Sequence, residues 1–366
     1  MWKSRKKPSS PFCALGRIEI TGLPPTPSNW KKILPGLLIS LLSLVIIFIL
    51  VDLDQLWQAL QLANYWLVGV FLGLTFIWLV VRSVVWYSLL EENYPLGNVF
   101  LAINQGYLLN NLLPFRLGEI GRAILLKSKT TIPSDSANPG GTGFFYILST
   151  ILIERALDLA MAAGLLLITL PFVIGANWAL QAALSAAGLV LIGLGGLFML
   201  ARNRTWAQMK VVQISARIPL LQKVGSKQIN TFLNGLTTLT DSRRFLKVTG
   251  LMILNWTIAV LQYYMLMLAF FPQAKILYAA FSLGVVALGI AVPSSPGAIG
   301  IMELSLVGAL SVFKLDPSVA FALALTAHLT NYLFTGIIGA YAFAKDGQKI
   351  TDLYQRARRL SQENTN

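Results

Sequence analysis

Residues 114–121 read Pro-Phe-Arg-Leu-Gly-Glu-Ile-Gly, and residues 293–300 read Pro-Ser-Ser-Pro-Gly-Ala-Ile-Gly. Both segments follow the pattern P-x-x-x-G-x-I-G, and each interrupts an apolar region, residues 98–126 and 276–313, near its middle. Proline and glycine are tolerated in membrane helices, so simple kinks are one interpretation. The repeat favours the other, in which each region is a helical hairpin that enters the membrane and returns to its own side. The predicted hairpin turns contain Pro114, Gly118, Pro293, Pro296 and Gly297.

The rest of the chain is strongly apolar. Hydrophobic residues make up 55% of it and charged residues 12%, and the mean hydropathy is +0.67, far from the values of a soluble domain. Six further apolar stretches are long enough to cross a hydrocarbon core of ~30 Å as helices. They are residues 34–51, 66–90, 146–174, 178–201, 246–271 and 318–344. The fold class is therefore predicted as an all-α integral membrane protein with six full spans and two re-entrant hairpins.

The spans and hairpins repeat in the same order along the chain. Repeat one, about residues 34–174, and repeat two, about residues 178–344, each contain two spans, a hairpin and a third span. Three crossings is an odd number, so the second copy must lie upside down and the hairpins must enter from opposite faces. Inverted repeats with interrupted helices are typical of alternating-access transporters. Because interrupted helices leave backbone groups that lipid cannot satisfy, we expect a polar cavity between the turns.

The basic residues indicate the orientation. With a cytoplasmic N-terminus, only Lys275 and Lys314 fall in outer loops, and Arg82, Arg116 and Arg155 fall inside apolar segments. The other 24 of the 29 Lys and Arg residues lie on the inner side, as the positive-inside rule requires. This asymmetry explains the net charge of +14 without nucleic acid as a partner. Both termini are predicted to be cytoplasmic, in what we expect to be a bacterial inner membrane.

The domain boundaries follow from the same pattern. We expect residues 1–32 to form a disordered basic cytoplasmic tail, residues 33–344 a single transmembrane domain, and residues 345–366 a cytoplasmic C-terminal tail. Within the domain, residues 202–247 form a cytoplasmic insertion with nine basic residues and one acid. An amphipathic helix on anionic inner-leaflet headgroups and a solvated loop both fit this insertion. The sequence leaves the oligomeric state open.

Three charged residues interrupt one predicted span. Glu154, Arg155 and Asp158 follow the apolar run 144–153, so ten helical residues place them ~15 Å deep. Each charge would cost ~2.5–3.5 kcal/mol in lipid, so the group must face protein or water. Glu154 and Asp158 share a helix face, and Arg155 can pair with Asp158. A functional site and a set of structural ion pairs both explain such a cluster.

The first hairpin adds a possible anion site. Arg116 and Arg122 flank the turn where its second half-helix starts, so the helix N-terminus and two guanidinium groups would converge there. Arginine binds phosphate through two parallel hydrogen bonds, which suits an anionic headgroup. The predicted substrate-binding residues are Arg116, Glu119, Arg122, Glu154, Arg155, Asp158 and Glu303.

Two more ionisable residues lie in flanking spans. With Arg82 included, the buried positions hold four arginines and four carboxylates, which indicates a nearly neutral interior. Arg82 lies near the inner end of its span, so snorkelling to the interface and a functional role fit equally well. His328 lies in an apolar helix beside Thr330 and Asn331, and we expect a hydrogen-bonded packing role for it.

Three ordered motifs carry a resemblance to a known family. They are residues 110–122, Asn-Asn-Leu-Leu-Pro-Phe-Arg-Leu-Gly-Glu-Ile-Gly-Arg, residues 154–158, Glu-Arg-Ala-Leu-Asp, and residues 293–303, Pro-Ser-Ser-Pro-Gly-Ala-Ile-Gly-Ile-Met-Glu. In these motifs the chain resembles the flippase-like membrane domain of bacterial lysylphosphatidylglycerol synthases and their stand-alone relatives. The resemblance implies movement of a phospholipid or lipid-linked species between leaflets. Because no soluble aminoacyl-transfer domain follows residue 344, synthase activity is not expected.

Two other function classes remain open. An ion-coupled small-solute transporter could share this architecture, with Glu154 or Asp158 carrying protons. A membrane headgroup or glycosyl transferase could use Asp52 and Asp54, in the first outer loop, as a metal or base site. The single Cys13 cannot form an internal disulfide, and no Cys and His residues have metal-ligand spacing. We therefore expect a transporter without enzyme activity, metal or cofactor, with membrane lipids as its partners.

Overall fold

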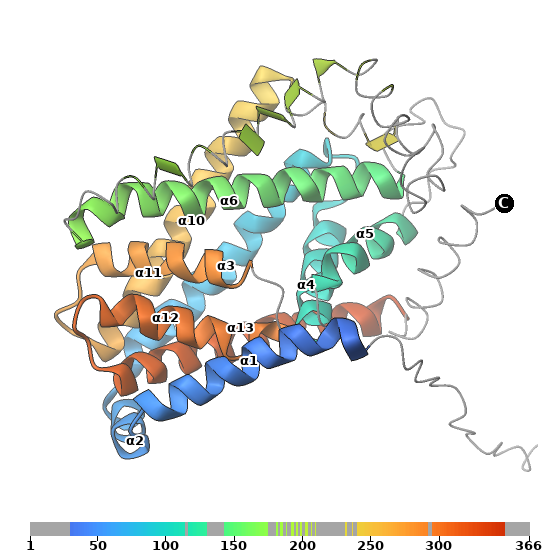
Figure 1. Cartoon of the computed structure of the whole chain (residues 1–366). Helices are drawn as coiled ribbons and strands as arrows, with labels where there is room; N and C mark the ends of the chain where they lie inside the picture. Colours follow the sequence, from blue (N-terminus) through green and yellow to red (C-terminus); the bar gives the residue numbers. More distant parts are fainter. Residues whose placement is uncertain are drawn as a thin grey trace, which may run out of the picture.

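The computed structural model describes residues 30–113, 116–129, 143–174, 240–291 and 295–347, together with isolated positions between 181 and 236. Helices make up almost all of the described part, in which no strand occurs. Their bounds are α1 Trp30–Leu50, α2 Leu53–Leu62, α3 Tyr65–Leu89, α4 Leu96–Leu112, α5 Gly118–Ser128, α6 Phe144–Ile174, α10 Ser242–Phe270, α11 Ile276–Gly289, the 3-10 turn η3 Pro296–Ala298, α12 Ile301–Ser311 and α13 Pro317–Lys345 (Figure 1). The all-α class is thereby confirmed.

Four helices, α3, α6, α10 and α13, are long and apolar enough to cross a membrane, as predicted for four of the six spans. The helix in the predicted span 34–51, α1, passes the same test only together with α2, and the two meet at an angle of 84°. The predicted span 178–201 lies outside the continuously described residues. The structure therefore supports four spans, or five if the bent pair counts as one.

Polar caps fix where several of these helices begin. The side chains of Asp52, Asn64, Asp241 and Asp316 accept hydrogen bonds from backbone N–H groups in the first turns of α2, α3, α10 and α13. Such caps satisfy N–H groups that a helix start leaves without a partner. Residues 53–62, predicted as part of an outer loop, form a helix because Asp52 caps it in this way.

Both predicted hairpin regions contain two short helices that pack against each other, α4 with α5 and α11 with α12. In Figure 1, α5 ends on the right, where α6 begins, whereas α12 ends on the left, where α13 begins. The turns of the two pairs touch, since Arg116 Nη2 donates to the carbonyl oxygen of Ile290 at 2.7 Å and η3 packs on α4. Pro114 and Pro293, expected at these turns, lie outside the described residues.

Glycine permits the close approach of α4 and α5. A Cβ atom on Gly118 would lie 1.9 Å from the carbonyl oxygen of Gly106 and 2.6 Å from Oδ1 of Asn110. That same Oδ1 accepts a hydrogen bond from the Gly118 N–H at 2.8 Å. The absence of a side chain thus lets the start of α5 rest on the backbone of α4.

We predict that Gly118→Ala lowers the thermal unfolding midpoint of the purified protein, because the added methyl group collides with backbone. Overpacking of this kind costs ~1–3 kcal/mol or more. Gly97→Ala, on the neighbouring α4, is the matched control, since its Cβ would meet no atom within 4 Å. Equal midpoints for Gly118→Ala and Gly97→Ala in the same detergent would contradict the described contact.

Candidate functional site

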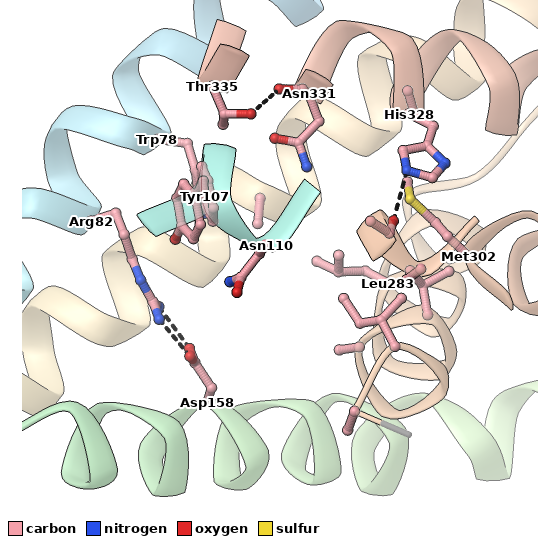
Figure 2. Close-up of a pocket in the computed structure, with 18 of the residues that line it drawn as sticks. Trp78, Arg82, Tyr107, Asn110, Asp158, Leu283, Met302, His328, Asn331 and Thr335 are labelled. Carbon is pink, nitrogen blue, oxygen red and sulfur yellow. Dashed lines mark hydrogen bonds and ion pairs between the residues drawn. The ribbon is translucent and has the colours of Figure 1, made fainter. Parts of the chain in front are cut away.

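A cavity of about 530 Å³ lies where the two hairpin turns meet α3, α6, α10 and α13. One part of its wall is polar, including Tyr107, Asn110 and the facing pair of Arg82 and Asp158 (Figure 2). Another part is apolar, with Leu283 on α11 and Met302 on α12. The volume is in the range of ligand-binding pockets. A cavity between the turns is therefore present as predicted, but its lining is amphipathic rather than polar.

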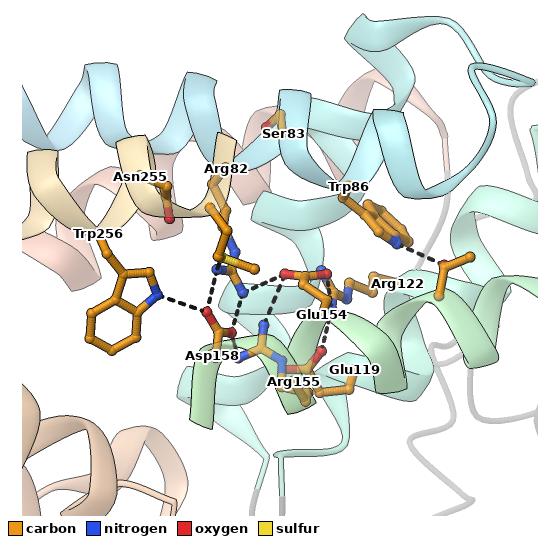
Figure 3. Close-up of polar contacts among 12 residues, drawn as sticks. Arg82, Ser83, Trp86, Glu119, Arg122, Glu154, Arg155, Asp158, Asn255 and Trp256 are labelled. Carbon is orange, nitrogen blue, oxygen red and sulfur yellow. Dashed lines mark hydrogen bonds and ion pairs between the residues drawn. The ribbon is translucent and has the colours of Figure 1, made fainter. Parts of the chain in front are cut away.

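Three arginines and three carboxylates form an ion-pair network beside the cavity (Figure 3). Glu154 is its centre, fully buried on α6, with carboxylate oxygens 2.5 Å from Arg82, 2.9 Å from Arg122 and 3.2 Å from Arg155. The network ties α3 and α5 to α6. Since three charges of each sign are present, it brings no net charge into the apolar bundle.

The other two carboxylates complete the pairing. Asp158 accepts hydrogen bonds from Arg82 at 2.7 and 2.5 Å, and from the indole N–H of Trp256 at 3.2 Å. It also lies 3.2 Å from Arg155, which confirms the pairing expected from their spacing. Glu119 binds Arg122 at 2.8 Å and Arg155 at 3.4 Å. Every carboxylate of the network therefore contacts two or more arginines.

Arg82 is an internal residue. Its side chain is only 2% exposed and holds Glu154 and Asp158, so snorkelling to the interface, one of the two interpretations of the sequence, is wrong. The cost of burying a guanidinium group explains this arrangement, because removal from water is offset only when the charge is fully paired and hydrogen-bonded.

Arg116 is the exception among these arginines. It lines the cavity, yet among the described residues no carboxylate lies within ion-pair distance of it. Its side chain instead donates to the Ile290 carbonyl, and its backbone has φ 52°, in the left-handed region that is uncommon for residues other than glycine. The wall of the cavity thus carries one arginine whose charge is not neutralised by a partner.

Glu303 lies in a separate site on the second hairpin. Its Oε2 accepts the N–H of Gly300 at 2.7 Å, and its Oε1 contacts Nδ1 of His328. The other ring nitrogen of His328, Nε2, lies 3.0 Å from the carbonyl oxygen of Gly297. His328 is thus hydrogen-bonded, as expected from the sequence, but it also lines the cavity.

The structure divides the predicted site residues into two groups. Arg116, Glu119, Arg155, Asp158 and Gly297 line the cavity. The residues Arg122, Glu154, Glu303, Gly118 and Pro296 do not line it. Among the described residues, no group of His, Cys, Asp or Glu side chains is arranged to hold a metal ion.

Several cavity residues were not predicted from the sequence. They are uncharged and lie on apolar helices: Trp78, Tyr107, Asn110, Asn255, Gln262, Asn331 and Thr335. An amide inside a predicted span is the one signal that could have indicated them, since such a group needs a partner or water in lipid. Two of these amides remain unsatisfied acceptors, because Asn255 Oδ1 and Gln262 Oε1 are buried without a hydrogen-bond partner.

We predict that Glu154→Gln destabilises the protein, because the amide leaves three arginines around two carboxylates. Breaking a buried ion pair costs ~3–5 kcal/mol. Adding Arg122→Gln restores equal numbers of charges, so the double variant should lose less stability than the sum of the two single variants. Thermal unfolding of the four proteins in one detergent measures this coupling, and strictly additive losses would contradict the network.

Comparisons with known proteins identify the family of the chain. A family model described as the lysylphosphatidylglycerol synthase TM region matches residues 33–339. A UPF0104 membrane protein of Methanocaldococcus jannaschii is 26% identical over 235 residues, which are 64% of this chain and 92% of that protein. No solved structure gives a significant match. Because the family model covers most of the chain, the protein belongs to the family of the lysylphosphatidylglycerol synthase transmembrane region and is an integral membrane protein.

Proposed function

We propose that the protein is a transporter that moves a phospholipid or a lipid-linked anionic headgroup between the leaflets of the membrane. The observation that carries this proposal is Arg116, an arginine in the cavity wall without a carboxylate partner among the described residues. A guanidinium group in such a place favours an anion, and phosphate accepts two of its N–H donors at once. A phosphate headgroup supplies the missing countercharge.

The remaining cavity wall suits the rest of such a molecule. Amide groups of Asn110, Asn111 and Asn331 offer donors and acceptors, and the unpartnered oxygens of Asn255 and Gln262 can accept from hydroxyl or ammonium groups. The apolar part of the wall can contact the adjoining glycerol or acyl carbons. This combination supports a molecule that is charged at one end and apolar at the other.

The hairpins support a transport role as well. We propose that they enter the membrane from opposite faces as parts of an inverted repeat with six spans, both termini being cytoplasmic. Their touching turns and the cavity between them are the features that such carriers use to expose one site to either side in turn. Moving the Arg116–Ile290 contact would change the wall of the cavity directly.

One of the two residues suggested for the transferase alternative has another role. The Asp52 side chain accepts the N–H groups of Asp54 and Gln55 at 2.9 and 3.1 Å, which gives it the role of a helix cap. An ion-coupled small-solute transporter remains the second candidate, because a site of this kind also accommodates a soluble organic anion. We therefore propose a carrier without enzyme activity.

We predict that Arg116→Ala slows lipid movement about tenfold or more in liposomes. The reason is that a hydrogen bond to a charged group contributes ~1.5–3 kcal/mol, and ~1.4 kcal/mol corresponds to a factor of ten. The assay reconstitutes the protein with headgroup-labelled anionic lipids and follows their accessibility to a membrane-impermeant quencher. Arg243→Ala, at an exposed position at the start of α10, is the matched control and should transport normally.

Full transport by Arg116→Ala would refute the proposed role of Arg116. Uptake of solutes without lipid movement would select the small-solute alternative.

We also predict that the two hairpins are labelled from opposite sides. In a Cys13→Ser background, Ser128→Cys at the end of α5 should react only with reagents on the cytoplasmic face. Lys314→Cys, in the loop after α12, should react only from outside; both positions are exposed. Labelling of both from one face, by an impermeant maleimide on intact cells, would refute the inverted arrangement.

A further inference from the structure

The contacts of His328 with Glu303 and Gly297 determine where its ring hydrogens must be. A carbonyl oxygen can only accept, so the contact between Nε2 and the Gly297 oxygen, at 3.0 Å, requires hydrogen on Nε2. A neutral imidazole with that hydrogen presents a bare lone pair on Nδ1. Nδ1 nevertheless contacts a carboxylate oxygen of Glu303, which also bears lone pairs. A further proton must therefore lie between Nδ1 and Oε1.

The pair consequently binds one exchangeable proton. With that proton it is neutral overall, as imidazolium with carboxylate or as imidazole with carboxylic acid, and without it the pair carries one negative charge. Among the described residues, Glu303 has no ion-pair partner other than His328. The titratable groups that act on its carboxylate from neighbouring elements are two tyrosines, Tyr263 on α10 and Tyr332 on α13. No arginine of the network pairs with Glu303 to hold it as an anion.

Losing the proton changes the contacts between helices. A neutral ring has one N–H group but faces two acceptors, so it can bind either Glu303 on α12 or Gly297 in η3, but not both. One of the two links from α13 to the second hairpin must break. Glu303 also holds the start of α12 through the Gly300 N–H, so its movement would disturb the same turn.

The proton site and the proposed anion site act on the same structural element. Arg116 binds the end of α11 at Ile290, and His328 binds η3 at Gly297, so the two contacts hold the two described flanks of one hairpin turn. Both Arg116 and His328 line the cavity, so cavity water can deliver the proton. By contrast, Glu154 and Asp158, the proton carriers considered from the sequence, each contact two or more arginines, which favours their charged forms.

We propose that the His328–Glu303 pair is a proton-binding site that couples movement of the anionic substrate to a proton gradient. This proposal rests on the transport function proposed above. One proton is taken from water in the cavity on one side of the membrane and returned to water on the other, and only N–H and O–H bonds are made and broken. Protonation keeps both hydrogen bonds from His328 to the second hairpin, and deprotonation releases one of them.

The first test is independent of transport. His328 is the only histidine of the chain, so protein labelled with ¹⁵N-histidine gives a single imidazole in NMR spectra. In lipid nanodiscs we expect hydrogen on Nε2 at low pH and a single step in the imidazole ¹⁵N signals as the pH rises and the pair releases its proton, and Glu303→Gln should alter that step. Thr326→Val, a control on the same helix, should leave it unchanged. Imidazole signals that do not change with pH, or a bare Nε2 throughout, would overturn the proton site.

The second test measures coupling in liposomes that contain headgroup-labelled lipid and an internal pH dye. The wild type and Thr326→Val should move lipid severalfold faster under a pH gradient, with acidification or alkalinisation of the lumen. His328→Gln and Glu303→Gln should lose this response while still inserting and folding. An unchanged response in both variants, or a wild type indifferent to the gradient, overturns the coupling. If the wild type moves no lipid but the NMR step is present, the transport function fails and the proton site stands.

Discussion

The need to neutralise charge inside an apolar bundle governs the centre of this protein. Glu154 is completely buried and is surrounded by three arginines from three different helices, α3, α5 and α6. None of these charges would be stable there alone, because the cost of removing an ion from water exceeds what a single contact returns. A packing of α3, α5 and α6 that left one of these groups unpaired would be costly, so the network disfavours other arrangements of the three helices.

This constraint distinguishes the charged residues of the network from those outside it. The network uses Arg82, Arg122 and Arg155 against Glu119, Glu154 and Asp158, with each carboxylate shared. Arg116 and the Glu303–His328 pair are left outside it, and both contact the turn of the second hairpin. A balanced region that holds the helices is thus adjacent to an unbalanced region that faces the cavity. The same chemistry serves structure in the first region and, in our proposal, ligand and proton binding in the second.

Much of this organisation could be predicted from the sequence, because it depends on residues that are close together along the chain. The lengths of the apolar stretches predicted the helices α3, α6, α10 and α13. The paired Pro and Gly motifs predicted the two regions that each contain a pair of short helices. The pairing of Arg155 with Asp158 followed from helix geometry. The partners of Arg82 did not, since Asp158 is 76 residues away and only the packing of α3 on α6 brings them together. The helix α2 was not predicted, because its segment is too short and too polar to suggest a membrane span. The capping residue Asp52 was the signal for its start.

The hydrogen bond from Arg116 to the Ile290 carbonyl holds the guanidinium group against the end of α11, in the wall of the cavity. This contact uses Nη2, so other N–H groups of the guanidinium can bind an anion, which would give up part of its own hydration shell to reach them. A small, strongly hydrated ion such as chloride offers few contacts in return, whereas a headgroup with several oxygens and attached carbon can also engage the amides and the apolar wall. In the proposed carrier, this difference in contacts would favour a headgroup over common inorganic ions.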